Sequence, residues 1–157
     1  MLPLDKYRSI YEVMPISCVD VLVKNPQGEV LLVHRLNEPA AGQWWFPGGR
    51  VCYGERRAEA AIRKLREEVG IIGEAPLELF TEDLLFLEKE VDAPRHGITT
   101  VFSFCLTSTE QPRLDAQSGD AQWRTPDIWL LETLHPFVQK VLRSMPFHSA
   151  PDNKKNS

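Results

Sequence analysis

The stretch FPGGRVCYGERRAEAAIRKLREEVGI, residues 46–71, constrains the fold more than any other part of the chain. A Gly-Gly pair precedes a run with helical periodicity, which we expect to span about residues 55–69. Gly70 should end this helix, because glycine readily adopts the left-handed conformation found at helix C-termini. The core face expected on a helical wheel consists of Ala58, Ala61, Ile62, Leu65 and Val69. A second layer of the protein must therefore cover this face.

The rest of this helix is charged. Its ordinary interpretation is a solvated face with ion pairs four residues apart, such as Glu59–Arg63 and Arg63–Glu67. However, glutamates at the C-terminal end oppose the helix dipole. Glu68 also falls at the rim of the apolar arc, where a charge needs a partner. A divalent cation would answer both objections, since Mg²⁺ is bound by one or two carboxylates together with water and substrate phosphate.

The remaining pattern predicts strands, the helix, strands and a second helical region. The turn residues NPQG predict two strands on either side of them within residues 16–36, and Asp20 is a carboxylate inside the first, apolar strand. The other expected elements are a short helix within KYRSIYEVM, a loop at 37–49, strands at 77–91 and 98–107 separated by the loop VDAPRHG, a polar loop at 113–120, the short strand AQWR, and a helical region at 126–145 interrupted near His135–Pro136. This order indicates an α/β fold with a mixed sheet between helices.

The composition excludes several classes of protein. A chain of 157 residues with 43% hydrophobic and 25% charged residues suits one globular domain, which we place at residues 1–145 before a polar, disordered tail at 146–157. A net charge of -4 argues against a nucleic-acid groove. The 3 cysteines form no CxxC pair, so we expect reduced thiols in a cytoplasmic protein. Nothing approaches the ~18 apolar residues of a membrane span.

The charged helix and the glycines before it resemble the Nudix box, G-x5-E-x7-R-E-U-x-E-E-x-G-U, where U is aliphatic. The positions that match are Gly49, Glu55, Arg63, Leu65, Glu67, Glu68, Gly70 and Ile71. The resemblance implies an α/β/α sandwich. It also implies hydrolysis of a nucleoside diphosphate linked to another group, with Mg²⁺ or Mn²⁺ as the cofactor.

One position departs from the box, because Lys64 stands where the family has a glutamate that is commonly a metal ligand or general base. A protonated lysine is not a ligand, and its charge repels a divalent ion. Two interpretations stay open. Either the enzyme binds fewer metal ions or uses another base, or the domain is degenerate and inactive.

The segments around the box resemble one branch of the family, the GDP-mannose mannosyl hydrolases, which also lack that glutamate. The similarity covers roughly residues 8–130. It rests on RLNEPAAGQWWFPGGRV at 35–51, on VDVLV with Asp20, on Thr99–Thr100, and on DAQ before Trp123. In this branch water attacks the anomeric carbon of the sugar with inversion, and GDP leaves.

This branch resemblance assigns roles to individual residues. The metal ligands would be the Gly48 carbonyl, Glu68 and Gln117, and Glu67 would be a further ligand or a supporting group. Arg35 and Arg50 would hold the diphosphate, because the guanidinium fork suits phosphate oxygens. Asp20 would contact the sugar or support an arginine. Three of these residues also have a purely structural interpretation. Arg35 could be a surface residue, Asp20 could be a buried partner of Arg35, and Gln117 could be a solvated loop residue. For Trp44 and Trp45 the choice is between a base-stacking wall and the core.

The general base is unassigned. Ser118 follows Gln117 where the branch has a histidine, and a serine hydroxyl does not take a proton from water near neutral pH without help. Asp120, Asp115 or His96 are the alternatives. Three functions follow: a hydrolase of a GDP-mannose-like nucleotide-sugar, a Nudix pyrophosphohydrolase that attacks phosphorus, or a nucleotide-binding module without turnover. The family resemblance also suggests a homodimer.

Overall fold

The computed structural model describes residues 2–86, 94–116 and 118–145. The expected metal ligand Gln117 and the expected disordered tail at 146–157 therefore lie outside the described residues, as do the first three residues of the loop VDAPRHG. Within the described ranges, no helix is long and apolar enough to cross a membrane.

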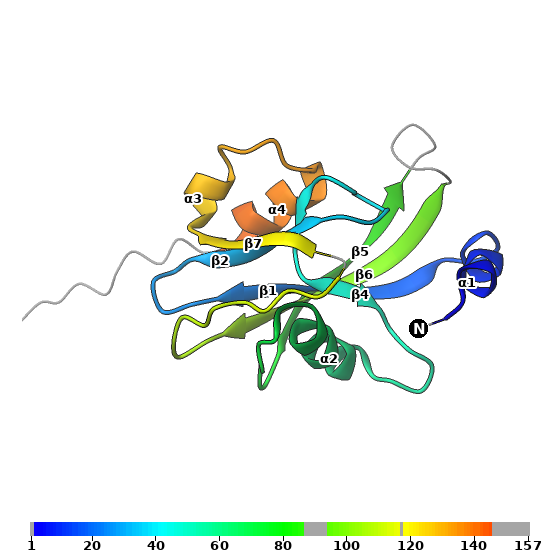
Figure 1. The fold of residues 1–157 in the computed structure, drawn as a ribbon, viewed down its shortest axis with the longest axis horizontal. Coiled ribbons are helices and arrows are strands. Elements are labelled where there is room, and N and C mark those ends of the chain that lie inside the picture. The colour runs from blue at the N-terminus through cyan, green and yellow to red at the C-terminus, as the bar shows by residue number, and fades with distance from the viewer. Residues whose placement is uncertain (1, 87–93, 117, 146–157) are drawn as a thin grey trace, which may run out of the picture.

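A mixed sheet of seven strands forms the centre of the described chain (Figure 1). Its main path is β3-β2-β1-β6-β5, with β4 paired to β1 and β7 paired to β2. The strands are β1 Ile16–Lys24, β2 Val30–Arg35, β3 Trp44–Trp45, β4 Gly48–Arg50, β5 Leu77–Phe86, β6 Arg95–Cys105 and β7 Ser118–Arg124. β1 and β6 run parallel, whereas β4 runs antiparallel to β1.

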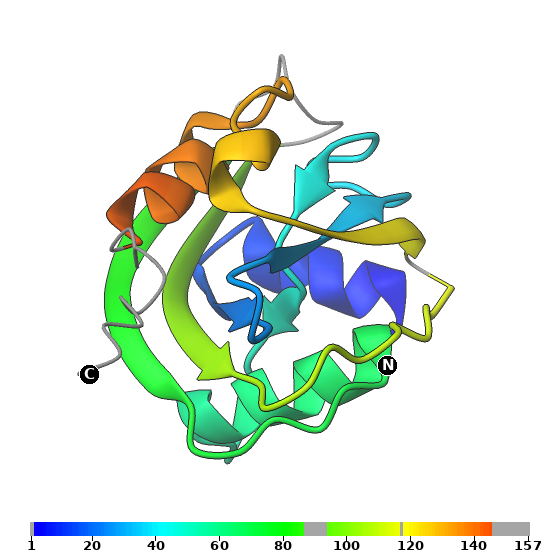
Figure 2. The same cartoon turned by 90° about the vertical axis from the view of Figure 1, so that its left-hand side faces the viewer.

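Helices cover both faces of this sheet. The helices are α1 Leu4–Tyr11, α2 Arg57–Val69, α3 Pro126–Trp129 and α4 Pro136–Ser144. Figures 1 and 2 show α2 on one face and α3 with α4 on the other, while α1 lies beyond one end of the strands. This arrangement confirms the predicted α/β/α sandwich with a mixed sheet.

The central strands β1 and β2 are buried on both faces, which is why they are nearly continuous apolar runs. Val19 and Val21 of β1 pack in the core under α2, and the intervening face contributes Leu22 to the core under α3 and α4. Asp20 shares that second face of β1, because alternate residues of a strand point to opposite sides. The carboxylate is thereby placed inside the protein.

Four predicted boundaries were wrong. The expected loop at 37–49 contains β3 and the start of β4, and β7 begins at Ser118 inside the expected polar loop. β6 begins at Arg95, three residues early, because it extends along β5 to pair Arg95 with Phe86. α2 begins at Arg57 rather than near Glu55, because the Glu55 carboxylate folds back to accept a hydrogen bond from the Cys52 amide, 3.1 Å away.

Candidate active site

The glycine pair before α2 lies against strand β1. The Val21 amide donates to the Pro47 carbonyl over 2.8 Å, and the Val51 amide donates to the Ser17 carbonyl over 2.8 Å, so β4 is held in register along β1. A Cβ atom added to Gly48 would lie 2.2 Å from the Val19 carbonyl oxygen, which no side chain tolerates. Glycine is therefore required at position 48, and its close approach brings the backbone of β4 under the end of α2.

Glu68, a predicted metal ligand, is buried at this point. Its side chain is 3% exposed, and its Oε2 accepts a hydrogen bond from the Gly48 amide over 3.0 Å. Burial raises the pKa of the Glu68 carboxyl, while the charge of Lys64 and the Gly48 amide act in the opposite direction. A buried carboxylate in this position requires a cation.

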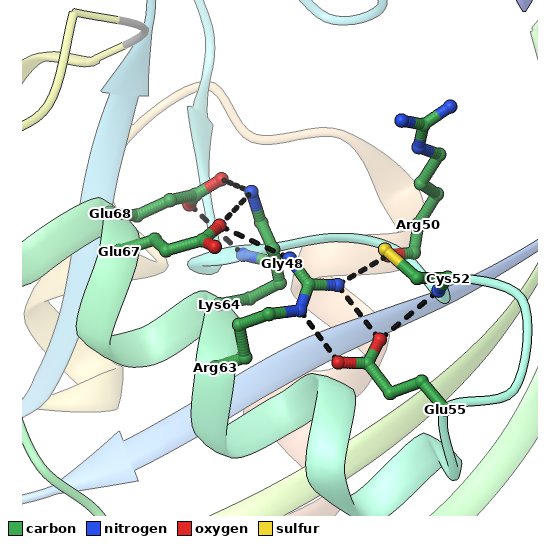
Figure 3. A network of polar contacts seen from close by, with 8 residues as sticks. All are labelled: Gly48, Arg50, Cys52, Glu55, Arg63, Lys64, Glu67 and Glu68. Carbon is green, nitrogen blue, oxygen red and sulfur yellow. Dashed lines mark hydrogen bonds and ion pairs between the residues drawn. The ribbon is translucent and has the colours of Figure 1, made fainter. Parts of the chain in front are cut away.

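Lys64 is the cation that the chain itself places there (Figure 3). Its Nζ lies 3.3 Å from Glu68 Oε1 and 3.6 Å from Glu67 Oε2, and its side chain is 12% exposed. The predicted partner of Glu68 was a divalent ion. In the structure the lysine that departs from the Nudix box contacts both predicted glutamate ligands.

Arg63 organises the other side of the helix (Figure 3). It donates to both carboxylate oxygens of Glu55, over 2.7 and 2.9 Å, and to the Arg50 carbonyl over 3.1 Å. Its contact with Glu67, 3.1 Å long, is one of the two predicted ion pairs. The other, Glu59–Arg63, was wrong, because Glu59 instead accepts a hydrogen bond from the Arg56 amide at the start of α2.

Asp20 is held by two distant partners. Its Oδ2 accepts from the Thr99 hydroxyl over 2.9 Å, and its Oδ1 accepts from the Trp45 indole over 3.2 Å. Burial raises the pKa of this carboxyl to about 6, against the lowering effect of these hydrogen bonds and of Arg35. Trp45 is itself buried and stacks on Phe137, so it belongs to the core.

The predicted diphosphate-binding arginines approach from two strands. Arg35, at the end of β2, donates its Nε hydrogen to the Pro39 carbonyl over 2.8 Å. Arg50, in β4, stacks its guanidinium over the Tyr7 ring at 5.2 Å, and its side chain points away from the glutamates in Figure 3. Tyr7 was not among the predicted site residues. No sequence signal marks it, since α1 reaches Arg50 only through the tertiary fold.

A cleft of about 890 Å³ unites most of these groups. It extends from α1 to α2, and the predicted site residues that line it are Asp20, Arg35, Gly48, Arg50 and Glu67. Lys64 lines the same cleft. Its volume lies in the range of ~300–1,000 Å³ that ligand pockets usually have.

The three candidate bases are placed differently. Asp120 accepts hydrogen bonds from the Ala121 amide and from Gln122, and His96 contacts Asp83 at 2.8 Å. The Asp115 amide donates to the Glu68 carbonyl over 3.2 Å, so the segment before Gln117 is tied to the C-terminal end of α2. Ser118 is buried and pairs with Arg35 across β7 and β2.

The fit of this site to a divalent ion depends on its donor set. Across the described residues, no three histidine, cysteine, aspartate or glutamate side chains lie together as a metal site. Glu67 and Glu68 supply two adjacent carboxylates, which is the number that Mg²⁺ commonly uses when water and substrate phosphates complete its shell. These two residues therefore fit a divalent ion of that kind.

The fold and the box together define the class of protein. The Nudix domain family matches residues 14–145, and the chain belongs to the Nudix hydrolase family. Members of this family act on nucleotide-derived substrates and typically use a divalent metal ion.

Three known proteins show the similarity in more detail. The low-salt glycan biosynthesis protein Agl8 of Haloferax volcanii is 30% identical over 146 residues, which is 92% of this chain and 90% of that protein. The crystal structure of the MutT protein from Methanosarcina mazei Go1 has a TM-score of 0.67 and 26% identity, with 82% of this chain and 91% of that chain covered. The MutT Nudix hydrolase from Burkholderia pseudomallei has a TM-score of 0.71 and 24% identity, with 83% and 97% covered.

Proposed function

We propose that this Nudix hydrolase acts on a nucleoside-diphosphate-sugar of the GDP-mannose kind and releases free sugar and the nucleoside diphosphate. The observation that carries the proposal is the single cleft that Arg35, Arg50 and Glu67 line together with Asp20. Two guanidinium groups that line the cleft suit a diphosphate, and a buried carboxylate suits the hydroxyl groups of a sugar. The similarity to a glycan biosynthesis protein supports a substrate that carries a sugar.

In this reaction, water attacks the anomeric carbon while the bond between that carbon and the diphosphate oxygen breaks. The electron pair leaves with the oxygen, so negative charge grows on the diphosphate, and the proton that the water loses is released to solvent. Arg35 and Arg50 bind this diphosphate and stabilise the growing charge. Asp20, fixed by Thr99 and Trp45, orients the sugar.

Glu67 and Glu68 would hold a Mg²⁺ or Mn²⁺ ion, with the Gly48 carbonyl and Gln117 as further ligands by resemblance. When bound, the ion supplies positive charge at the leaving group. The amide of Gly48 orients the Glu68 carboxylate for this role. We also propose that the protein is a cytoplasmic homodimer. The dimer is tested by measuring the molar mass in solution with light scattering after size-exclusion chromatography.

A second candidate function is cleavage between the two phosphates, with water attacking phosphorus. Two observations favour it. Glu67 lies beside Glu68 as in the general Nudix box, and Ser118 takes the place of the histidine base that sugar release uses in the resembling branch.

The test is incubation of the protein with Mg²⁺ and GDP-mannose or GDP-glucose in water labelled with oxygen-18. Products are separated by chromatography and weighed by mass spectrometry. We expect GDP and labelled free sugar. GMP with sugar phosphate, and label in a phosphate, would establish the second candidate instead, and absence of turnover on both substrates would contradict the proposed substrate class.

A further inference from the structure

Lys64 lines the cleft with a side chain that is only 12% exposed, rather than extended into solvent. Its ammonium group contacts the two adjacent glutamates of α2, 3.3 Å from Glu68 and 3.6 Å from Glu67. Most lysines expose this group, because it is strongly hydrated and the side chain is flexible. Holding it here therefore requires the two carboxylates.

The backbone around Lys64 is shaped to admit this side chain. A Cβ atom added to Gly49 would lie 2.6 Å from Lys64 Cε and 3.2 Å from its Nζ. The lysine thus passes over the bare backbone of β4 to reach the glutamates. From there it lines the same cleft as Arg35 and Arg50.

The neighbouring Arg63 does not contact the buried Glu68 in the way that Lys64 does. Arg63 gives two hydrogen bonds to Glu55 and one to the Arg50 carbonyl, and it touches the carboxylate pair only through Glu67. Lys64 is therefore the cation that the described residues place against the buried Glu68. The two glutamates and Lys64 carry one net negative charge, whereas a glutamate at position 64 would make it three.

From this geometry we propose that Lys64 is a built-in cation of the active site, which offsets part of the negative charge of the Glu67–Glu68 pair and offers its ammonium group to the substrate diphosphate. The second part rests on the proposed function, whereas the first part does not. Affinity for divalent ions rises with the number of charged ligands. Lys64 should consequently lower the number of ions that the site binds.

The first test counts bound Mn²⁺ by electron paramagnetic resonance, without substrate, in the wild type and in Lys64→Glu. Arg66→Glu is the matched control, because it makes the same charge change on the same helix at an exposed position outside the cleft. We expect Lys64→Glu to bind at least one more ion per chain than either of the others. Equal binding by Lys64→Glu and Arg66→Glu would overturn the counter-ion role.

A second variant keeps the test decisive if Lys64→Glu does not fold. Lys64→Met has similar length without charge, so it leaves Glu68 buried without its ammonium partner. We expect a lower melting temperature than the wild type in EDTA, and a larger rise on adding Mg²⁺. Identical melting temperatures, and identical shifts with Mg²⁺, would contradict the counter-ion role.

The diphosphate contact is tested with inorganic pyrophosphate by calorimetry in EDTA. We expect Lys64→Met to bind it about tenfold more weakly than the wild type, as loss of one charge-assisted contact predicts, and Arg66→Met to bind it as the wild type does. Unchanged binding by Lys64→Met would overturn this part. None of these readouts involves hydrolysis, so a failure of the proposed sugar release would be seen separately.

Discussion

Glu55 lies in the turn before α2 and Glu68 lies in the last turn of α2. Each contacts a cation of that helix, yet their carboxyl pKa values shift in opposite directions. The hydrogen bonds from Arg63 lower the pKa of Glu55. Burial raises the pKa of Glu68, although Lys64 and the Gly48 amide oppose it. The same residue type thus meets a stabilising partner at one end and a large desolvation cost at the other.

The Arg63–Glu55 and Lys64–Glu68 pairs also differ in the geometry of their contacts. Arg63 binds Glu55 through two parallel hydrogen bonds, a geometry that fixes the turn before α2 against the helix. Lys64 places a single ammonium charge 3.3 Å from Glu68, and lysine lacks the planar set of donors with which arginine binds both oxygens of a carboxylate. The first pair is suited to structure, whereas the second places a single point charge beside a buried carboxylate.

The largest expected effect is on turnover in Glu68→Gln. The neutral amide keeps an acceptor for the Gly48 amide but loses the charge that would hold a divalent ion. We expect hydrolysis to fall by about a hundredfold or more, with little change in melting temperature. Steady-state kinetics on the preferred nucleotide-sugar measure this, and Glu59→Gln, on the outer face, should keep the wild-type rate. Full activity in Glu68→Gln would mean that Glu68 has no part in the reaction.

The two glycines beneath this pair should differ in the next largest effect. Gly48→Ala forces a Cβ against the backbone of Val19, and we expect a loss of about 2–3 kcal/mol in the free energy of unfolding. Gly49→Ala meets only the flexible end of Lys64, but its φ of 158° is one that L residues rarely adopt, so we expect a smaller loss of about 1–2 kcal/mol. Urea denaturation compares them, and equal losses would show that the close approach of β4 to β1 is not limiting.

Arg63→Lys should weaken the structural pair. Lysine cannot reproduce the two parallel hydrogen bonds to Glu55 together with the contact to the Arg50 carbonyl, so we expect the free energy of unfolding to fall by about 1–2 kcal/mol. Arg66→Lys, at an exposed position of the same helix, is the control in the same urea experiment. If both variants lose the same amount, the arginine fork at position 63 has no special role.

The smallest expected effect is the pH dependence that Glu55 confers. Its pKa is lower in the folded protein than its ordinary value of 4.5, so its contribution is fully present above pH 4.5 and is lost as the pH falls through the folded pKa. The wild type should exceed Glu55→Gln by about 0.5–1 kcal/mol near pH 7, and the two should converge in acid. Urea denaturation at several pH values measures the difference. A difference that persists unchanged into acid would exclude this ion pair as its source.

Much of the fold was predictable from local patterns. The apolar arc of α2 and the strands on either side of NPQG are periodicities of neighbouring residues, and the structure has both elements close to the predicted places. Gly70 ends α2 in the left-handed conformation, with φ of 69°, as its position indicated. The boundaries that were wrong, such as the start of β6, depend on how far two distant strands continue to pair.

The sequence by itself determined that the chain belongs to the Nudix family, because the spacing of the Nudix box is local and each position has a defined place on the helix. It did not determine what those residues contact. Thr99 and Trp45 reach Asp20 across 79 and 25 residues of chain, and Arg63 reaches back past the helix start to Glu55. Only the tertiary structure decided that Lys64 contacts a buried Glu68, because the burial of that carboxylate depends on the approach of β4 to α2, which no short-range pattern encodes.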